Sequence, residues 1–267
     1  MYLATESVNR NLSTFFMSRY FLEVAYKGTQ YSGFQIQENA NSVQAEIEKA
    51  FEIYYRKTFG MTGSSRTDTG VHALQNFFHF DFNGEINAAS LYNINSILPD
   101  DIVVKNLYLA DAEAHCRFDA ESREYAYHIH QKKNPFLRDR AYYYPYKLDL
   151  EKLREVAAVV AGYSDFTSFS KRSTQTKTFL CSILTSEWSG TDEGFTYHVK
   201  ANRFLRGMVR ALAGTMLHVG RNKISVDDFI AIIESKDNTK ADFSVPGHGL
   251  FLTKVNYPEG MLRKLEE

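Results

Sequence analysis

The order in which strand-like and helix-like patterns follow one another most constrains how this chain can fold. The first half is predicted to contain three strands separated by two helices, a β-α-β-α-β order, over 19–26, 43–54, 75–82, 87–98 and 102–109. Ser42 is a suitable N-cap for the first helix. Phe78, Phe80 and Phe82 alternate onto one face of the middle strand. This pattern predicts a sheet with helices packed against it.

The second half of the chain has a similar content of elements. They are a strand at 122–131, a helix at 150–161, two paired strands at 179–188 and 195–201, helices at 204–219 and 225–234, and a strand at 250–255 that closes the sheet. Gly162 ends the first of these helices, and Ser225 with Asp228 forms a capping box at the start of the last one. The turn between the paired strands is predicted at Ser189-Gly190.

The similarity of the halves predicts a pseudo-duplicated α+β architecture. We expect two α/β halves whose antiparallel sheets are joined side by side, with a cleft between them. The expected boundaries are 1–18 for an N-terminal tail, 19–115 for the first half and 116–267 for the second. Because the strand pattern begins directly after Met17, residues 1–16 are interpreted as a loose tail or as residues ahead of the natural start.

Composition indicates a protein with a packed core that works inside the cell. Hydrophobic residues make up 44% of the chain, enough for a globular core. No apolar run approaches the length of a membrane span and no signal peptide is evident, so a cytoplasmic location without membrane contact is expected. Cys116 and Cys181 have neither metal-ligand spacing nor a disulfide framework, which predicts free thiols in a reducing compartment.

Charge is distributed unevenly along the chain. The formal net charge of −1 argues against nucleic-acid binding through overall basicity. Residues 132–147, however, carry five basic side chains and one acidic one, with Phe136 and four tyrosines among them, and 171–178 add three more cations. Cations neutralise phosphates and aromatic faces stack bases. These segments either contact nucleic acid or form a solvated basic loop beside an aromatic strand.

The run from Gly60 to Gly70 is dense in Gly, Ser and Thr and carries Arg66 and Asp68. Long connections inside compact domains are uncommon, and they are usually functional or disordered. A nearby guanidinium favours the ionised form of a carboxylate, and an ionised, positioned Asp can act as nucleophile, base or ligand. From the spacing alone, the two residues either perform chemistry or pin the loop.

The order of residues from Arg66 to Ala73, Arg-Thr-Asp-Thr-Gly-Val-His-Ala, resembles the signature of the TruA family of tRNA pseudouridine synthases. Further motifs occur in the family's order over roughly 19–257, at 25–29, 32–37, 42–44, 95–99, 117–120, 123–127, 165–169, 204–205, 208–210 and 249–250. The resemblance implies the pseudouridine synthase fold. It also implies an isomerase that converts uridine to pseudouridine at positions 38, 39 and 40 of the tRNA anticodon stem-loop, and a homodimer that binds one tRNA across both subunits.

The resemblance assigns roles to four residues. Asp68 is the essential aspartate, which either attacks C1′ of the ribose or removes a proton from C2′ to give a glycal. Arg210 is the cation that pairs with it, although helical spacing places Arg206 on the same predicted helix face. Arg66 is left free to fill the space of the everted base and to bind phosphate. Tyr125 stacks on the everted uracil, and its hydroxyl is an alternative relay for the C5 proton, although tyrosine titrates near 10. Without the resemblance, solvated arginines and ordinary sheet packing would explain the arginines and the tyrosine equally well.

No cofactor and no metal site is expected. The isomerisation consumes no electrons or phosphate, and the sequence contains no P-loop, dinucleotide fingerprint or clustered His and Cys ligands. His72 is interpreted as a structural residue, and His128 and His130 share a strand without a third ligand. Two other functions stay open: a non-catalytic RNA-binding or RNA-folding module on the same scaffold, and a glycosidic hydrolase, which typically needs a second carboxylate.

The sequence departs from the family pattern at three places. Ser65 stands where glycine commonly precedes the arginine. Arg206-Gly207 replaces an aromatic-polar pair, and 245–248 (Val-Pro-Gly-His) stands where Ala-Pro-Ala is usual. None of these changes removes the aspartate, the tyrosine or either arginine, and we expect them to affect affinity or substrate choice.

Overall fold

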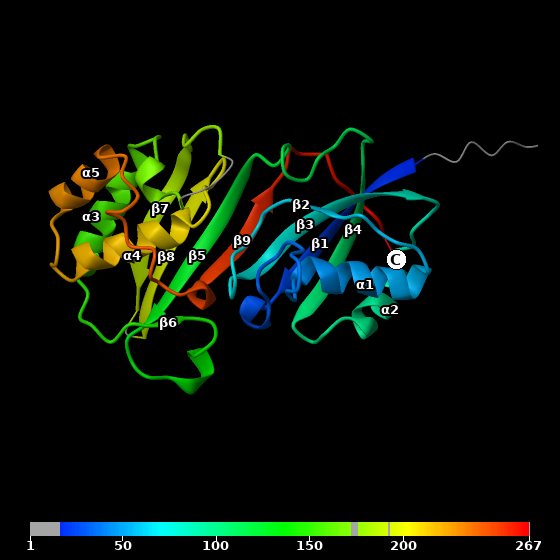
Figure 1. Ribbon diagram of the computed structural model, residues 1–267, viewed down its shortest axis with the longest axis horizontal. Helices are drawn as coiled ribbons and strands as arrows, with labels where there is room; N and C mark the ends of the chain where they lie inside the picture. The colour runs from blue at the N-terminus through cyan, green and yellow to red at the C-terminus, as the bar shows by residue number, and fades with distance from the viewer. Residues whose placement is uncertain (1–16, 172–175, 192, 267) are drawn as a thin grey trace, which may run out of the picture.

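The computed structural model describes residues 17–171, 176–191 and 193–266 (Figure 1). Most of the predicted tail at 1–18, and part of the basic segment at 171–178, therefore lie outside the described residues. The described strands form one mixed sheet in the order β10-β4-β1-β3-β9-β5-β8-β7, with β2 paired to β3 and β6 paired to β5. The mixed α/β fold class predicted from the sequence is confirmed.

The first half of the chain contributes one end of this sheet and two helices. Its elements are β1 (Met17–Tyr26), η1 (Gly28–Gln30), α1 (Val43–Tyr55), β2 (Thr62–Gly63), β3 (His72–Asn83), α2 (Ser90–Ile97) and β4 (Ile102–Ala110). Ser42 caps α1, as predicted, by accepting a hydrogen bond from the backbone N–H of Ala45. Phe78 and Phe80 of β3 face α1, where they pack against Phe34 and Phe51 and form an aromatic core.

The second half supplies the other end of the sheet and three helices, and its last strand, β10, lies at the first half's end beside β4. Its elements are β5 (Ser122–His130), η2 (Pro135–Leu137), β6 (Tyr142–Tyr143), α3 (Leu150–Ala161), η3 (Thr167–Phe169), β7 (Ile183–Gly190), β8 (Gly194–Ala201), α4 (Met208–Gly220), α5 (Val226–Glu234), η4 (Gly247–Gly249), β9 (Leu250–Asn256) and β10 (Arg263–Lys264). The predicted capping box of α5 is present, formed by Ser225 and Asp228. The two groups of helices lie at opposite ends of the sheet (Figure 1).

Strand β9 joins the two halves. It pairs in parallel with β3 through His72–Phe251 and Ala73–Leu252, and in antiparallel fashion with β5. The prediction that 250–255 closes the sheet is therefore wrong, because this strand lies at the centre and β10 returns to the far edge beside β4. The halves share one continuous sheet that β9 bridges.

Several predicted boundaries differ from the observed ones, each for a local reason. β2 lies inside the predicted loop at 60–70, because it pairs with β3 at Phe78 and His79. Helix α2 begins at Ser90 rather than at 87, since the side chain of Asn87 accepts the N–H of Ala89 in a preceding turn. β7 begins at Ile183, because the residues before it pair with 164–166, and it continues through Gly190, so the turn follows the predicted Ser189-Gly190. Among the described residues, no helix combines the length and the apolar composition that crossing a membrane requires.

Candidate active site

A buried network of hydrogen bonds holds the loop that carries Asp68 in place. The hydroxyl groups of Thr67 and Tyr26 lie 2.8 Å apart, and the Asn76 side chain donates to the carbonyl of Ser65 at 2.8 Å and to the Tyr26 hydroxyl at 3.3 Å. Unpaired buried polar groups are costly, so such a network favours one loop conformation. Ser65, which replaces the usual glycine, is buried and fits this arrangement.

A turn directly after Asp68 directs the chain into β3. The N–H of Val71 donates to the carbonyl of Asp68 at 3.1 Å, and Gly70 adopts a left-handed φ of 76° that side chains rarely adopt. A Cβ added at Gly247 would lie 2.3 Å from the carbonyl oxygen of Thr69. The glycine at 247, a departure from the family pattern, thus permits close contact between this loop and the segment before β9.

Two cations from the second half of the chain face Asp68. Nη1 of Arg210 lies 3.3 Å from a carboxylate oxygen of Asp68, and Nζ of Lys171 lies 3.7 Å from the same oxygen. The side chains of Asp68 and Arg210 are 25% and 16% exposed, so the pair is shielded but remains open to a substrate. Arg210 is fixed by donating from Nε to the carbonyl of Val245 at 2.8 Å and from Nη2 to that of Phe243 at 3.4 Å. Its guanidinium is therefore positioned by backbone as well as by charge.

The start of α4 explains why Arg210 rather than Arg206 reaches Asp68. The helix was predicted from 204, but it begins at Met208, and Gly207 before it adopts a left-handed φ of 76°. Arg206 therefore precedes the helix and is exposed, so the prediction that both arginines share one helix face is wrong. The glycine, which could not be recognised as a helix boundary from periodicity, changes the direction of the chain there.

Lys171 contacts Asp68, but it was not predicted from the sequence as a residue of the site. Its backbone N–H donates to the carbonyl of Arg206, and its side chain crosses Gly207, where an added Cβ would meet Cγ of Lys171 at 3.1 Å. The only signal available was its place in the basic segment that follows the 165–169 motif.

Tyr125 projects from β5 into the same region. It is 8% exposed, and its ring packs edge-on against Phe204 at 5.1 Å between centroids. Burial raises the pKa of the Tyr125 hydroxyl to about 12; the charge of Arg123 opposes the rise and that of Asp68 adds to it. The phenol is therefore protonated near neutral pH. Tyr127, two residues on, is fully buried and donates to the carbonyl of Pro246, so it serves as a packing residue.

Arg66 is exposed, and its position differs from that of the paired cations. It lines a hollow together with Phe34, Arg117 and Phe118, on the loop segment that leads to Asp68. The structure thus brings Asp68, Arg210 and Tyr125 together and places Arg66 beside them.

His72, the histidine of the signature, makes structural contacts, in agreement with its interpretation from the sequence. Nδ1 of His72 accepts the N–H of Gly28 at 3.0 Å, and its Nε2 lies 3.1 Å from the carbonyl of His248. Burial lowers the pKa of His72, which favours the neutral ring that these contacts require.

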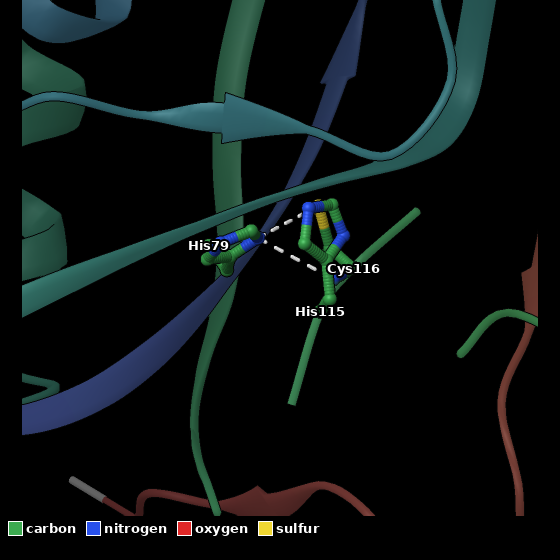
Figure 2. Close-up of side chains that lie close together, drawn as sticks. All are labelled: His79, His115 and Cys116. Carbon is green, nitrogen blue, oxygen red and sulfur yellow. Dashed lines mark hydrogen bonds between the residues drawn. The ribbon is translucent and has the colours of Figure 1, made fainter. Parts of the chain in front are cut away.

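A different group of potential metal ligands comes together in space. His79, His115 and Cys116 have ligand atoms that all lie within 4.8 Å of one another (Figure 2). Sequence spacing did not predict this group. The ligand atoms of these residues take part in hydrogen bonds. The backbone N–H of Cys116 donates to Nδ1 of His79, and the thiol of Cys116 donates to the carbonyl of Thr62. The backbone N–H of Arg117 donates to Nδ1 of His115. Burial lowers the pKa of His79 to about 4 and raises that of Cys116 to about 12, so the neutral forms are favoured. We interpret the group as a structural brace.

The contact of Asp68 with Arg210, close to the buried Tyr125, is the arrangement that the motif resemblance led us to expect. A family described as tRNA pseudouridine synthase matches residues 156–258. The chain is 45% identical over 246 residues to a tRNA pseudouridine synthase A of Bacteroides fragilis, covering 91% of this chain and 98% of the relative. It is 36% identical over 249 residues to one of Staphylococcus aureus, covering 92% and 94%. The chain belongs to the tRNA pseudouridine synthase A family.

Proposed function

We propose that this protein is a cofactor-independent tRNA pseudouridine synthase that isomerises uridine at positions 38, 39 and 40 of the anticodon stem-loop. The observation that carries the proposal is the contact of Asp68 with Arg210 across the two halves, next to Tyr125. Family membership supports the reaction. The target positions follow from the motif resemblance.

The reaction moves the glycosidic bond of uridine from N1 to C5. Asp68 acts on the ribose of an everted nucleotide, either by attacking C1′ or by taking the C2′ proton, and the N1–C1′ bond breaks in both routes. The freed uracil turns and C5 joins C1′. In the first route this displaces the Asp68 carboxylate from C1′, and in the second Asp68 returns the proton to C2′. The proton on C5 is then lost to solvent and N1 takes up a proton. Arg210 holds the carboxylate in position for either route, and a preorganised cation does this without reorganising during the reaction.

The neighbouring residues hold the nucleotide. Tyr125 offers a ring for stacking on the everted uracil, and its protonated hydroxyl suits a hydrogen-bond donor better than a base. Arg66, which is exposed, fills the space left in the RNA stack and binds phosphate. Lys171 adds a second cation at the carboxylate.

The basic and aromatic segment at 132–147 provides a further contact with tRNA. Phe136 is 82% exposed, and the guanidinium of Arg221 lies 3.5 Å from the centre of the Tyr146 ring. Exposed rings among cations suit a nucleic-acid backbone and unstacked bases. We further propose a cytoplasmic homodimer. Light scattering on the purified protein should give twice the monomer mass.

One experiment tests the function directly. The protein is incubated with tRNA that carries tritium at C5 of uridine, and tritium released to water is measured. We expect release by the wild type and none by Asp68→Ala that still binds tRNA. Binding of tRNA without release by the wild type would instead identify an RNA-binding module, and free uracil among the products would identify a hydrolase.

A further inference from the structure

A surface hollow lies beside the Asp68 loop, and apart from Arg66 none of its lining residues has a role in the reaction described above. It is lined by Phe34 and both residues of β2, and also by His115, Arg117 and Phe118. Arg66 lines it as well, and because successive Cα atoms are about 3.8 Å apart, the Cα atoms of Arg66 and Asp68 are at most ~7.6 Å apart. The hollow is therefore next to the catalytic loop.

The hollow is lined in part by Phe118, an exposed aromatic residue. The residue is 72% exposed, which is uncommon for a large aromatic residue. The ring of His115 packs at 4.3 Å from it, and the guanidinium of Arg117 lies 5.6 Å from its centroid. Even with these two neighbours the ring stays mostly exposed, so part of its surface can stack on a base.

The backbone that presents Phe118 is held rigidly. The buried guanidinium of Arg123 donates to the carbonyls of Arg117, Ala120 and Asn202. The hydroxyl of Tyr257 donates to the carbonyl of Cys116. The contacts between His79 and Cys116, shown in Figure 2, hold the same segment in place. Restricting a binding residue before its ligand arrives lowers the entropy cost of binding.

The charges at the hollow favour an anion. Arg66 and Arg117 are both exposed there. The nearest acid on the segment, Asp119, is turned to its own backbone, since its carboxylate accepts the N–H of His115 at 2.7 Å. An exposed aromatic ring in the same hollow as two exposed guanidinium groups suits a nucleotide, whose base stacks and whose phosphate is anionic.

We propose that this hollow binds a nucleotide of the tRNA that neighbours the isomerised uridine, with its base stacked on Phe118 and its phosphate facing Arg66 and Arg117. The proposal rests on the proposed function, because the occupant is part of the same substrate. It gives the 117–120 motif, which the reaction itself does not use, a role in holding the RNA while Asp68 acts.

The test compares Phe118→Ala with Tyr92→Ala, a matched control. Tyr92 is 77% exposed on α2 and takes no part in either site. We expect Phe118→Ala to raise KM for tRNA in the tritium-release assay by ~10-fold, the size of one lost base–aromatic stacking interaction. Tyr92→Ala should leave KM unchanged, and kcat should change less than KM in Phe118→Ala.

A second readout reports stacking directly. The chain has one tryptophan, Trp188, which is 2% exposed, so Phe118→Trp introduces an accessible fluorophore. We expect tRNA to quench Phe118→Trp by more than it quenches Tyr92→Trp. If the wild type releases tritium while Phe118→Ala keeps its KM, or if the two tryptophan variants are quenched equally, this inference fails and the proposed function stands. If the wild type releases no tritium, both fail.

Discussion

Replacing Arg210 by lysine tests whether the site depends on a positioned guanidinium or only on a positive charge. At 3.3 Å, two unit charges attract by about 5 kcal/mol for an effective dielectric constant of about 20. Lysine keeps this charge. It loses the two bonds that fix the guanidinium, from Nε to Val245 and from Nη2 to Phe243.

The expected cost follows from those two bonds. Without them the ammonium group is free to move by about 1 Å, and a misplacement of that size lowers rates by about 10²-fold, equivalent to ~2.7 kcal/mol in the activation barrier. We expect Arg210→Lys to lower kcat by about that factor. Arg210→Gln, which also removes the charge, should lower kcat by at least ~10³-fold. The free energy of unfolding should fall by only about 1–2 kcal/mol in Arg210→Lys.

The assay is tritium release at saturating tRNA, with thermal unfolding measured on the same samples. Arg206→Lys is the matched control, because Arg206 is exposed and precedes α4. The reasoning is refuted if Arg210→Lys keeps kcat within threefold of the wild type, or if Arg206→Lys loses as much activity.

Three further predictions concern stacking on the Tyr125 ring, the pH dependence of stability through His79, and the packing of Gly28 against Val71. Because the Tyr125 phenol is protonated, Tyr125→Phe should keep kcat within ~10-fold in the tritium assay while Tyr125→Ala loses at least ~100-fold; equal losses would favour a proton relay. His79 has a folded pKa of about 4, below its unfolded value of about 6.5, so its stabilisation is complete above pH 6.5 and is lost as the pH falls towards 4. Urea unfolding should show up to ~3 kcal/mol more loss over that range in the wild type than in His79→Gln. A Cβ at Gly28 would lie 2.0 Å from the carbonyl oxygen of Val71, so Gly28→Ala should lower the melting temperature by more than ~5 °C, whereas Gly60→Ala, with open space around it, should not.

Local patterns were enough to predict most elements. The N-cap at Ser42, the α5 capping box and the aromatic face of β3 are each set by residues within a few positions of one another. The central place of β9 could not be predicted, because its pairing with β3 joins segments far apart in the chain and leaves no periodic signal. The helix start at Met208 was missed because left-handed Gly207 interrupts an otherwise helical pattern.

The candidate site was predicted to a similar extent. Motif order led us to expect Asp68, Tyr125, Arg66 and Arg210 in the site with Arg210 as the partner of Asp68, and the structure places Arg210 in contact with the carboxylate. Lys171 was missed because its approach depends on the missing side chain of Gly207. The brace around Cys116 was missed because His79 lies 37 residues away in sequence.

The central position of β9 has a consequence for how the protein is made. As the chain leaves the ribosome, Asp68 and Arg210 emerge before the strand that links their halves. The first half can begin to fold early, but its aspartate cannot be held opposite the arginine until Leu250–Asn256 has been translated. We therefore expect a premature stop before this strand to yield an inert product, and expect the enzyme to gain activity only after this strand has been translated.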